Sequence, residues 1–331
     1  MEIFVWDGRQ ISKPGIYSKI PLSTYHRPNI CAAVDGSMKM ERDGKTFGPS
    51  VSSSGLRIFN PLSRKPNSPA HFWARSALNP AHIEEEDTDY FILGRALHHL
   101  ILSEPFFNKL FCERPDTVEG RKWDNGGWGT TAWKRWVAER KAEGRSILSP
   151  EQIHKIRGMA LRLGRNPEIG HGLLSGMVER SMFWIDRETG LWLKGRPDSI
   201  PRNLQFGDLK ITGTSVRWFD MQKSIEQFGY YQQAALVAEG CQILTGETMQ
   251  MFSYAFVEHK HPHCVDTVEI KDNDLKRGYE VNRVALRKIA HGLRTGEWPG
   301  PGEQGIRPIE MRERAQKIVD DFIKFGEAYD Q

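Results

Sequence analysis

The chain has 331 residues, enough to bury a large core and more than one minimal domain requires. Its formal charge of +4, from 46 Lys and Arg against 42 Asp and Glu, does not by itself indicate a nucleic-acid-binding protein. Four scattered cysteines without a C-x-x-C pair exclude a tight iron–sulfur cluster and are typical of a reducing cytoplasm. No apolar run approaches the roughly 20 residues of a membrane helix, and the N-terminus lacks the basic region of a signal peptide. We therefore expect a cytoplasmic protein without a membrane partner.

The first third of the chain predicts an irregular start followed by a helix. Residues 1–50 contain Gly, Pro and Ser throughout and predict irregular structure. Residues 87–103 predict a helix that carries His98, because apolar residues recur there at helical spacing.

A stretch rich in tryptophan comes next. Residues 115–148 hold four Trp among Gly and Lys and predict an excursion from the core that ends in a helix. Tryptophans can stack on unpaired bases, but we expect these to pack. Residues 150–163 predict a further helix, with Ser149 as its cap. Basic residues recur through both helical stretches, namely Lys134, Arg135, Arg140, Lys141, Arg145, Lys155, Arg157, Arg162 and Arg165. They predict either two solvated helix faces or a phosphate-binding track.

Three consecutive strands are predicted in the middle of the chain. Residues 181–186 and 191–196 predict a hairpin, because a turn sequence, Arg187-Glu188-Thr189-Gly190, lies between them. Pro197 ends the second strand, since proline cannot donate to a β-ladder. Residues 204–211 predict the third strand of this meander.

Two carboxylates and a lysine lie at the ends of these strands. Alternation along the third strand places Asp208 and Lys210 on one face and directs Leu209 into the core. Pairing with the preceding strand would bring Asp198 beside Asp208. Adjacent carboxylates repel unless a cation lies between them. A lone D-x-K is usually solvated surface and a lone P-D is usually a turn, but the pair on consecutive strands predicts a site for a hard cation and a phosphate ester.

The last third of the chain predicts helices around a hairpin. Residues 220–239 predict one helix with Ile225, Phe228, Gln232 and Ala235 on one face. A glutamine in an apolar stripe is costly unless it forms hydrogen bonds. It is either a satisfied structural residue or a contact to water or phosphate in the active site, and we favour the second. Residues 249–258 and 264–270 predict a hairpin, residues 275–293 a helix, and the C-terminus an amphipathic helix that begins near Pro308.

Together these motifs resemble the PD-(D/E)XK nucleases and, among them, the RecE-type (exonuclease VIII-like) phage recombination exonucleases. The resemblance covers most of the chain. It rests on Gly15-Ile16-Tyr17, Tyr25-His26, Ser52-Ser53-Ser54-Gly55-Leu56, Ser68-Pro69-Ala70-His71-Phe72, Leu93-Gly94-Arg95-Ala96-Leu97-His98, Gly195-Arg196-Pro197-Asp198, Gly207-Asp208-Leu209-Lys210 and Trp298-Pro299. Glu179 occupies the position that precedes the hairpin in this family.

The resemblance implies an α/β fold with a PD-(D/E)XK, restriction-endonuclease-like core, in which helices flank a mixed central β-sheet. We expect this core at residues 81–306, with an N-terminal elaboration at 1–80 and a C-terminal helix at 307–331. The implied activity is metal-dependent digestion of linear double-stranded DNA, processive and 5′ to 3′, which leaves 3′ single strands for recombination by strand annealing. The implied location is the cytoplasm of a bacterial host.

The resemblance also implies a ligand set and partners. Asp198 and Asp208 would bind two Mg²⁺ or Mn²⁺ ions with the carbonyl of Leu209, while His98 and Glu179 would complete the ligands of the second ion. Lys210 would position the attacking water, and Gln232 would contact water or phosphate. The expected partners are DNA ends, a RecT-like single-strand annealing protein and further copies of the chain in a trimeric or tetrameric ring.

Two departures from the family pattern leave alternatives open. Residues 32–50 form an insertion, and the Q-x-x-x-Y motif of related nucleases lacks its tyrosine, because Leu236 follows Gln232 at that distance. Tyr230 or Tyr231 is a possible replacement. The alternative functions are another PD-(D/E)XK repair or restriction nuclease, or a DNA-end-binding module without catalysis.

Overall fold

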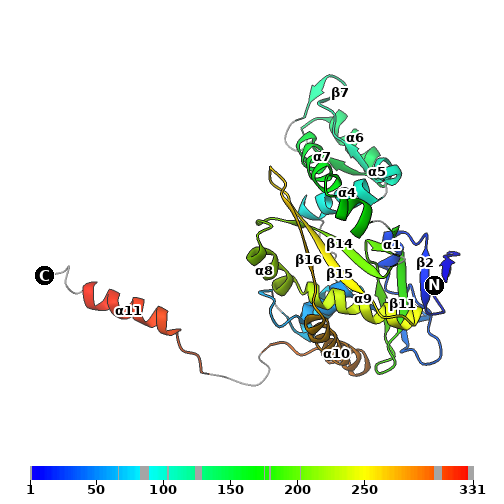
Figure 1. The fold of residues 1–331 in the computed structure, drawn as a ribbon, viewed down its shortest axis with the longest axis vertical. Helices are drawn as coiled ribbons and strands as arrows, with labels where there is room; N and C mark the ends of the chain where they lie inside the picture. The colour runs from blue at the N-terminus through cyan, green and yellow to red at the C-terminus, as the bar shows by residue number, and fades with distance from the viewer. Residues whose placement is uncertain are drawn as a thin grey trace. The chain divides into compact units, whose positions relative to one another are not determined.

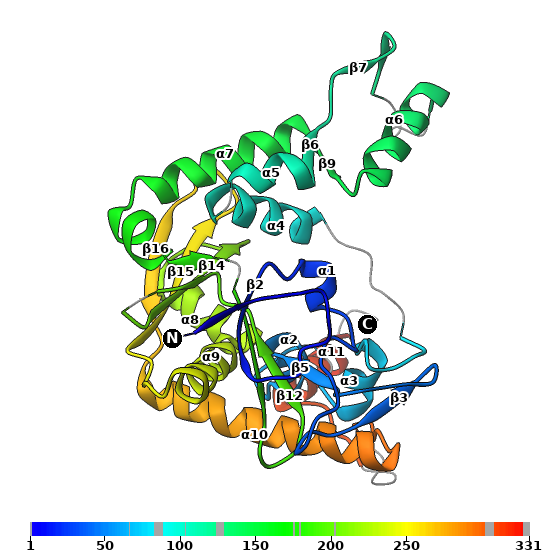
Figure 2. The same cartoon turned by 90° about the vertical axis from the view of Figure 1, so that its right-hand side faces the viewer.

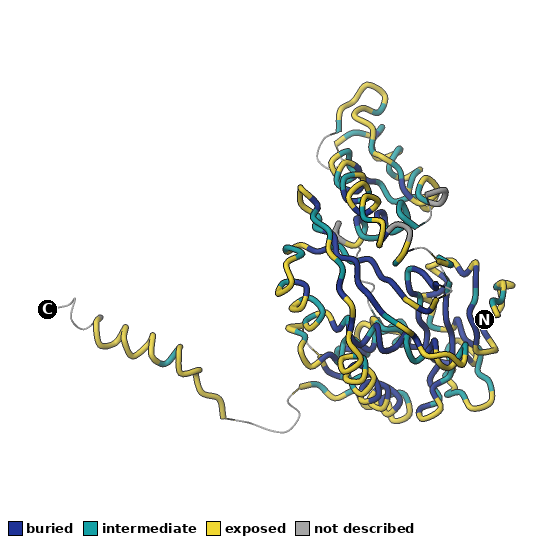
Figure 3. The backbone as a smooth tube through the Cα atoms, viewed as in Figure 1, coloured by how far each residue is buried: buried dark blue, intermediate teal, exposed yellow. Residues whose placement is uncertain are grey.

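The computed structural model describes residues 2–65, 67–82, 89–102, 104–123, 129–174, 176–178, 180–201, 203–301 and 308–326. The chain forms two compact units, Met1–Trp298 and Pro299–Gln331. The second unit contains α11 (Glu313–Gly326), whose apolar residues Ile318, Phe322 and Phe325 are exposed, as its yellow tube in Figure 3 shows. Among the described residues, no helix is long and apolar enough to span a bilayer.

Two mixed five-stranded sheets form the centre of the first unit. The first has the order β1-β2-β11-β12-β5 and consists of Ile3–Val5, Gly15–Ser18, Ser181–Ile185, Trp192–Gly195 and Ser50–Ser52. The second has the order β10-β13-β14-β15-β16 and consists of Met177–Val178, Ser199–Ile200, Gln205–Thr212, Met251–Glu258 and Val265–Glu269. Each sheet contains parallel and antiparallel pairs, so the predicted mixed α/β architecture is confirmed.

Three short hairpins or strand pairs lie outside the two sheets: β3–β4 (Met40–Arg42, Lys45–Phe47), β6–β9 (Phe111–Glu113, Ser146–Leu148) and β7–β8 (Thr117–Val118, Arg121–Lys122). The helices near the N-terminus are short, namely α1 (Leu22–Tyr25), α2 (Ser53–Leu56), the 3₁₀ turn η1 (Arg57–Phe59) and α3 (Pro69–Arg75). The prediction of irregular structure over the first fifty residues is wrong, because β1 pairs with β2, and β2 and β5 pair with the distant strands β11 and β12.

Helices α4 (Asp89–Leu102), α5 (Glu104–Leu110), α6 (Thr131–Ala142) and α7 (Pro150–Gly164) gather at one end of the unit in both views (Figure 1, Figure 2). The short π-helical segment η3 (Glu168–Leu173) follows α7. The Ser149 hydroxyl caps α7, as predicted, by accepting a hydrogen bond from the Gln152 N–H at 3.1 Å. These helices enclose a core cluster of their own, which includes Leu97, Ile156 and Leu209 of β14.

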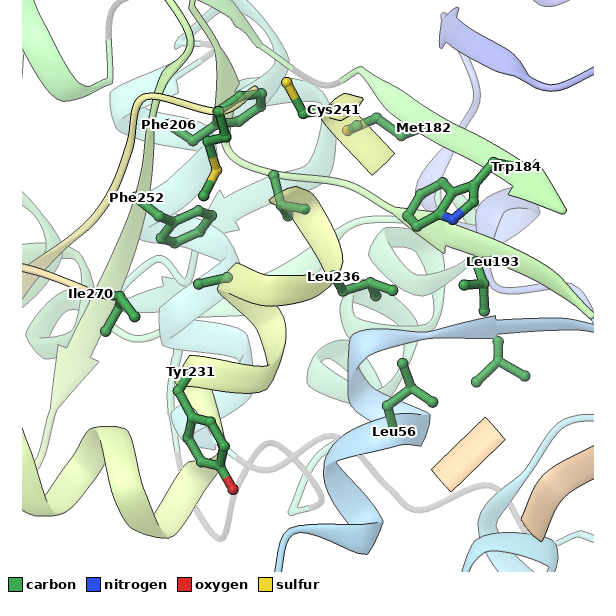
Figure 4. Packing of buried hydrophobic residues seen from close by; sticks show 14 of the residues in the cluster. Leu56, Met182, Trp184, Leu193, Phe206, Tyr231, Leu236, Cys241, Phe252 and Ile270 are labelled. Carbon is green, nitrogen blue, oxygen red and sulfur yellow. The ribbon is translucent and has the colours of Figure 1, made fainter. Parts of the chain in front are cut away.

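The remaining helices are α8 (Trp218–Phe228), α9 (Tyr230–Thr245) and α10 (Asp272–Thr295). Figure 4 shows α9 between side chains of both sheets, with Trp184 and Leu193 from the first sheet and Phe206 and Phe252 from the second. Because all four side chains are fully buried, this cluster joins the two sheets into one core.

The predicted central meander divides between the two sheets. Strands β11 and β12 form the expected hairpin, but β14 pairs with β13 and β15 instead of β12. The short strand β13, absent from our prediction, begins directly after Asp198 and provides the change of sheet. The predicted 220–239 helix is also wrong in its continuity, because Gly229 adopts a left-handed conformation (φ 64°) that separates α8 from α9.

Candidate active site

Strand β14 supplies the central acidic and basic groups. Leu209 is fully buried in the core cluster of α4 and α7, whereas Asp208 and Lys210 project from the opposite face of the strand. The Lys210 ammonium donates a hydrogen bond to the Asp208 carboxylate. The strand alternation predicted from the sequence therefore places both side chains together.

Asp198 reaches the same place from β13. Ser199 pairs with Gly207 across the β13–β14 ladder, and one carboxylate oxygen of Asp198 accepts a hydrogen bond from the Leu209 N–H at 2.6 Å. The predicted proximity of Asp198 and Asp208 thus occurs, although through a different strand pairing. Because the N–H and C=O of one strand residue point to the same side, the Leu209 carbonyl also faces the Asp198 side.

Helix α4 brings His98 to the carboxylates. Its Nδ1 lies 3.1 Å from Oδ1 of Asp198, while Leu93, Ala96 and Leu97 on the other side of the helix are buried in the core. The helix therefore presents His98 because its apolar stripe is anchored opposite. Glu179, which also belongs to the expected ligand set, lies outside the described residues.

The two carboxylates have opposite pKa shifts. Burial raises the pKa of Asp198, but His98, Lys210 and the Leu209 N–H outweigh it and hold the pKa below its usual range. Burial, and then the charge of Asp198, raise the pKa of Asp208. A divalent cation would relieve the repulsion that raises the Asp208 pKa, so this donor set fits a hard metal ion. Within the described residues, however, no three His, Cys, Asp or Glu side chains form a group that could hold a metal ion by themselves.

The glutamine predicted for the site is the wrong one of two neighbours. Gln232 is fully buried, and its amide donates to the Leu56 carbonyl at 3.3 Å and to Asn282 Oδ1 at 3.1 Å. Gln233 instead donates to Asp208 Oδ1 at 2.7 Å. The break at Gly229 rotates α9 relative to a continuous helix, so the predicted helical face does not apply.

The two candidate tyrosines also have different surroundings. The Tyr231 hydroxyl donates to Asn60 Oδ1 at 2.8 Å, away from the carboxylates. The Tyr230 ring lies 5.0 Å from the Lys210 ammonium, and the Tyr254 ring lies 5.4 Å from it. Two aromatic faces therefore hold the ammonium beside Asp208.

A cavity of about 450 Å³ is lined by His98, Asp198 and Lys210, and Arg95 and Arg196 line it as well. His26 and the serines at positions 52–54 also border this cavity. Burial, followed by the charges of Lys194, Arg196 and Arg95, lowers the pKa of His26 to about 4. The cavity therefore combines the Asp198 carboxylate, which suits a metal, with the guanidinium groups of Arg95 and Arg196, which suit a phosphate.

Gln233, Arg95 and Arg196 were not among the site residues predicted from the sequence. Arg95 and Arg196 stand inside the two quoted motifs, directly after Gly94 and Gly195, so a signal for them was present. The adjacent glutamines offered no comparable signal, because only the helix break distinguishes them.

Comparison with known proteins identifies the family to which the chain belongs. A family model described as a PDDEXK-like domain of unknown function (DUF3799) matches residues 52–305. The chain belongs to this family. The crystal structure of a protein from Eubacterium rectale described as a "putative exonuclease" is similar in fold, with a TM-score of 0.53, at 15% sequence identity over 80% of this chain and 91% of that chain. No curated protein matches the sequence. Membership of a PDDEXK-like family supports a nuclease, in agreement with the expected fold.

Proposed function

We propose that the protein is a metal-dependent exodeoxyribonuclease that digests linear double-stranded DNA. The observation that carries the proposal is that Asp198, Asp208, Lys210 and His98 lie together beside a cavity that Arg95 and Arg196 also line. A binding module without catalysis has no need of two buried carboxylates beside a phosphate.

The metal would be held by Asp198, Asp208 and the Leu209 carbonyl, with His98 at the edge of the site. When bound, divalent cations stabilise charge on the phosphate and on the leaving oxygen. Oxygen donors favour Mg²⁺, whereas an imidazole ligand would favour Mn²⁺. We propose two ions, with Glu179 as a further ligand.

The side chains of the chain have separate roles in this proposal. Lys210, held by Asp208 and Tyr230, orients the attacking water and offsets charge on the phosphate. Gln233 fixes the orientation of the Asp208 carboxylate through its hydrogen bond. Arg95 and Arg196 attract the phosphate backbone to the cavity.

An assay on labelled DNA tests the nuclease. Asp208→Ala and Lys210→Ala should each lower cleavage of linear duplex with Mg²⁺ by about 100-fold or more, because both groups act on the reacting phosphate. The exposed Lys276→Ala is the matched control and should retain activity. Near-normal cleavage by Lys210→Ala, with contaminating nuclease excluded, would contradict the assignment.

The same assay separates the finer alternatives. Separate 5′ and 3′ end labels report polarity, for which we propose 5′ to 3′. A covalently closed circle should survive, whereas its cleavage would indicate a repair or restriction endonuclease instead.

We further propose a ring of three or four subunits, which would remain around the product strand between cuts and pass it to a RecT-like annealing protein. Residues 1–80 and 307–331 are the proposed contact surfaces. Light scattering, combined with a challenge by trap DNA during digestion, tests the ring. A monomer that releases its substrate after each cut contradicts both the ring and the processivity.

A further inference from the structure

The positive charge of the chain is concentrated in one segment. Residues 104–165, here called the basic lobe, contain 13 Lys and Arg against 8 Asp and Glu, whereas the rest of the chain contains 33 against 34. The lobe therefore holds the entire net positive charge of the protein. It comprises α5, α6, α7 and the strands β6 to β9.

Helix α7 has an apolar face and a basic face. Ile153, Ile156 and Met159 are buried against the core of the lobe. The exposed side carries Arg157 and Arg162, Arg165 follows as the C-cap residue, and among the described residues none of these three forms an ion pair. The single acidic residue of the helix, Glu151, is paired with Lys155 at 2.7 Å. An ordinary solvated helix face would intersperse both signs of charge.

A tryptophan cluster fixes a second basic surface. Trp133 of α6 is fully buried, and its Nε1 donates to the carbonyls of Arg121 at 3.1 Å and Lys122 at 2.9 Å. Its ring packs edge-on against Trp123 at 4.7 Å. Trp123, Trp133 and Trp136 therefore pack, as expected, and hold the β7–β8 hairpin against α6, whereas Trp128 lies outside the described residues.

Cations surround this anchor. Arg121, Lys122, Lys134 and Lys141 are exposed, and no acidic side chain of the described residues pairs with them. Other basic residues of the same helix do have partners, such as Arg135 with Glu119 and Arg140 with Glu143. Seven cations of the lobe are thus available to an anion. Three lie along α7 and at its C-cap, and four lie around the tryptophan cluster.

The lobe is attached rigidly to the active site. Helix α7 shares a core cluster with α4, the helix that carries His98, and both views place α4 to α7 together at one end of the unit (Figure 1, Figure 2). A helix of 15 residues such as α7 is about 22 Å long, and duplex DNA presents one charge about every 1.7 Å of its axis. The lobe can therefore contact several phosphates at a fixed position relative to the cavity.

We propose that the basic lobe binds the phosphate backbone of duplex DNA outside the active-site cavity, an inference that rests on the proposed nuclease function. The unpaired cations displace counterions from the DNA, so the lobe supplies sequence-independent affinity. This accounts for a DNA substrate on a chain whose total charge is only +4.

The salt dependence of binding tests the proposal. The lobe variant Lys134→Gln/Lys141→Gln/Arg157→Gln is compared with the control Lys276→Gln/Lys288→Gln/Arg294→Gln, which removes the same charge from exposed positions of α10. Binding of the full chain to a fluorescein-labelled duplex of about 30 base pairs is measured in EDTA at several salt concentrations. The slope of log K against log salt should become shallower by about 2 to 3 in the lobe variant and stay unchanged in the control.

The outcomes separate the two proposals. In the cleavage assay, the lobe variant should keep its maximal rate within about twofold and require more DNA, because the lobe does not touch the reacting phosphate. A wild-type protein that neither binds nor cleaves duplex contradicts the nuclease itself. A wild type that cleaves, with equal slopes for the lobe variant and the control, overturns the role of the lobe alone.

Discussion

At the scale of single residues, two adjacent histidines of α4 have different surroundings. His98 lies 3.1 Å from Asp198, whereas the ring of His99 packs near Phe111 at 5.8 Å. Neighbours on a helix point about 100° apart, so only one can face the carboxylates. We expect His98→Ala to lower nuclease activity at least about tenfold more than His99→Ala. Equal losses, measured under single-turnover conditions, would mean that both act through packing.

The two glutamines of α9 make a second contrast. Gln233→Ala removes a contact to Asp208 without opening the core, so it should lower the cleavage rate by about tenfold or more and leave the melting temperature nearly unchanged. Gln232→Ala removes the side-chain donor to Asn282 Oδ1 and to the Leu56 carbonyl and should cost about 1 to 3 kcal/mol in the free energy of unfolding. Thermal unfolding and cleavage of each variant measure the two effects, and a reversed pattern would restore Gln232 to the site.

At the scale of elements, the α8–α9 junction decides which residues face the carboxylates. Gly229 has a φ of 64°, and a Cβ there would lie 2.7 Å from Gln232 Oε1. Gly229→Ala should therefore destabilise the protein by about 1 to 3 kcal/mol. Gly246→Ala, at φ 75° with open space around it, separates the conformational cost from the steric one. Chemical denaturation should show the larger loss for Gly229→Ala, and equal losses would show that the contact with Gln232 is unimportant.

At the scale of the whole molecule, a buried ion pair joins the first sheet to α10. Arg283 donates to both carboxylate oxygens of Asp186, at 2.6 and 2.9 Å, and to Glu188 at 2.8 Å. Burial raises the pKa of Asp186, but the bonds from Arg283 and Thr189 outweigh it, so the pKa lies below its usual range. The contribution of this carboxylate is complete above its unfolded pKa of about 4 and disappears as the pH falls through the lower folded value.

Asp186→Asn should therefore cost about 3 kcal/mol near neutral pH, because it removes both bonds to Asp186 and leaves the buried Arg283 with Glu188 as its remaining carboxylate. Its stability should also fall less steeply than that of the wild type below about pH 4. Asp274→Asn, which breaks an exposed pair with Arg277, is the control and should change little. Urea denaturation across this pH range measures both variants, and parallel pH profiles for Asp186→Asn and the wild type would contradict this linkage.

The features that depend on local periodicity could be predicted from the amino-acid sequence. The two-residue repeat of β14 placed Asp208 and Lys210 on one face, and the helical repeat of residues 87–103 placed His98 opposite an apolar stripe. The hairpin β11–β12, the hairpin β15–β16 and α10 followed from the same kind of pattern. The mixed α/β fold expected from the family resemblance is confirmed. This prediction was possible because motifs such as Gly195-Arg196-Pro197-Asp198 can be recognised without knowledge of the strand order.

The choice of strand partners and of the glutamine that reaches the site depends on long-range packing. The pairing of β2 with β11, of β5 with β12 and of β14 with β15 joins residues far apart in the chain, and hydrophobic periodicity contains no information about such partners. The left-handed conformation of Gly229 separates α9 from α8 and changes which residues of α9 face the site. Gln233, and not Gln232, therefore contacts Asp208. The unpaired cations of the basic lobe emerged in the same way, since a basic run becomes a DNA-binding surface only when folding leaves its charges without acidic partners.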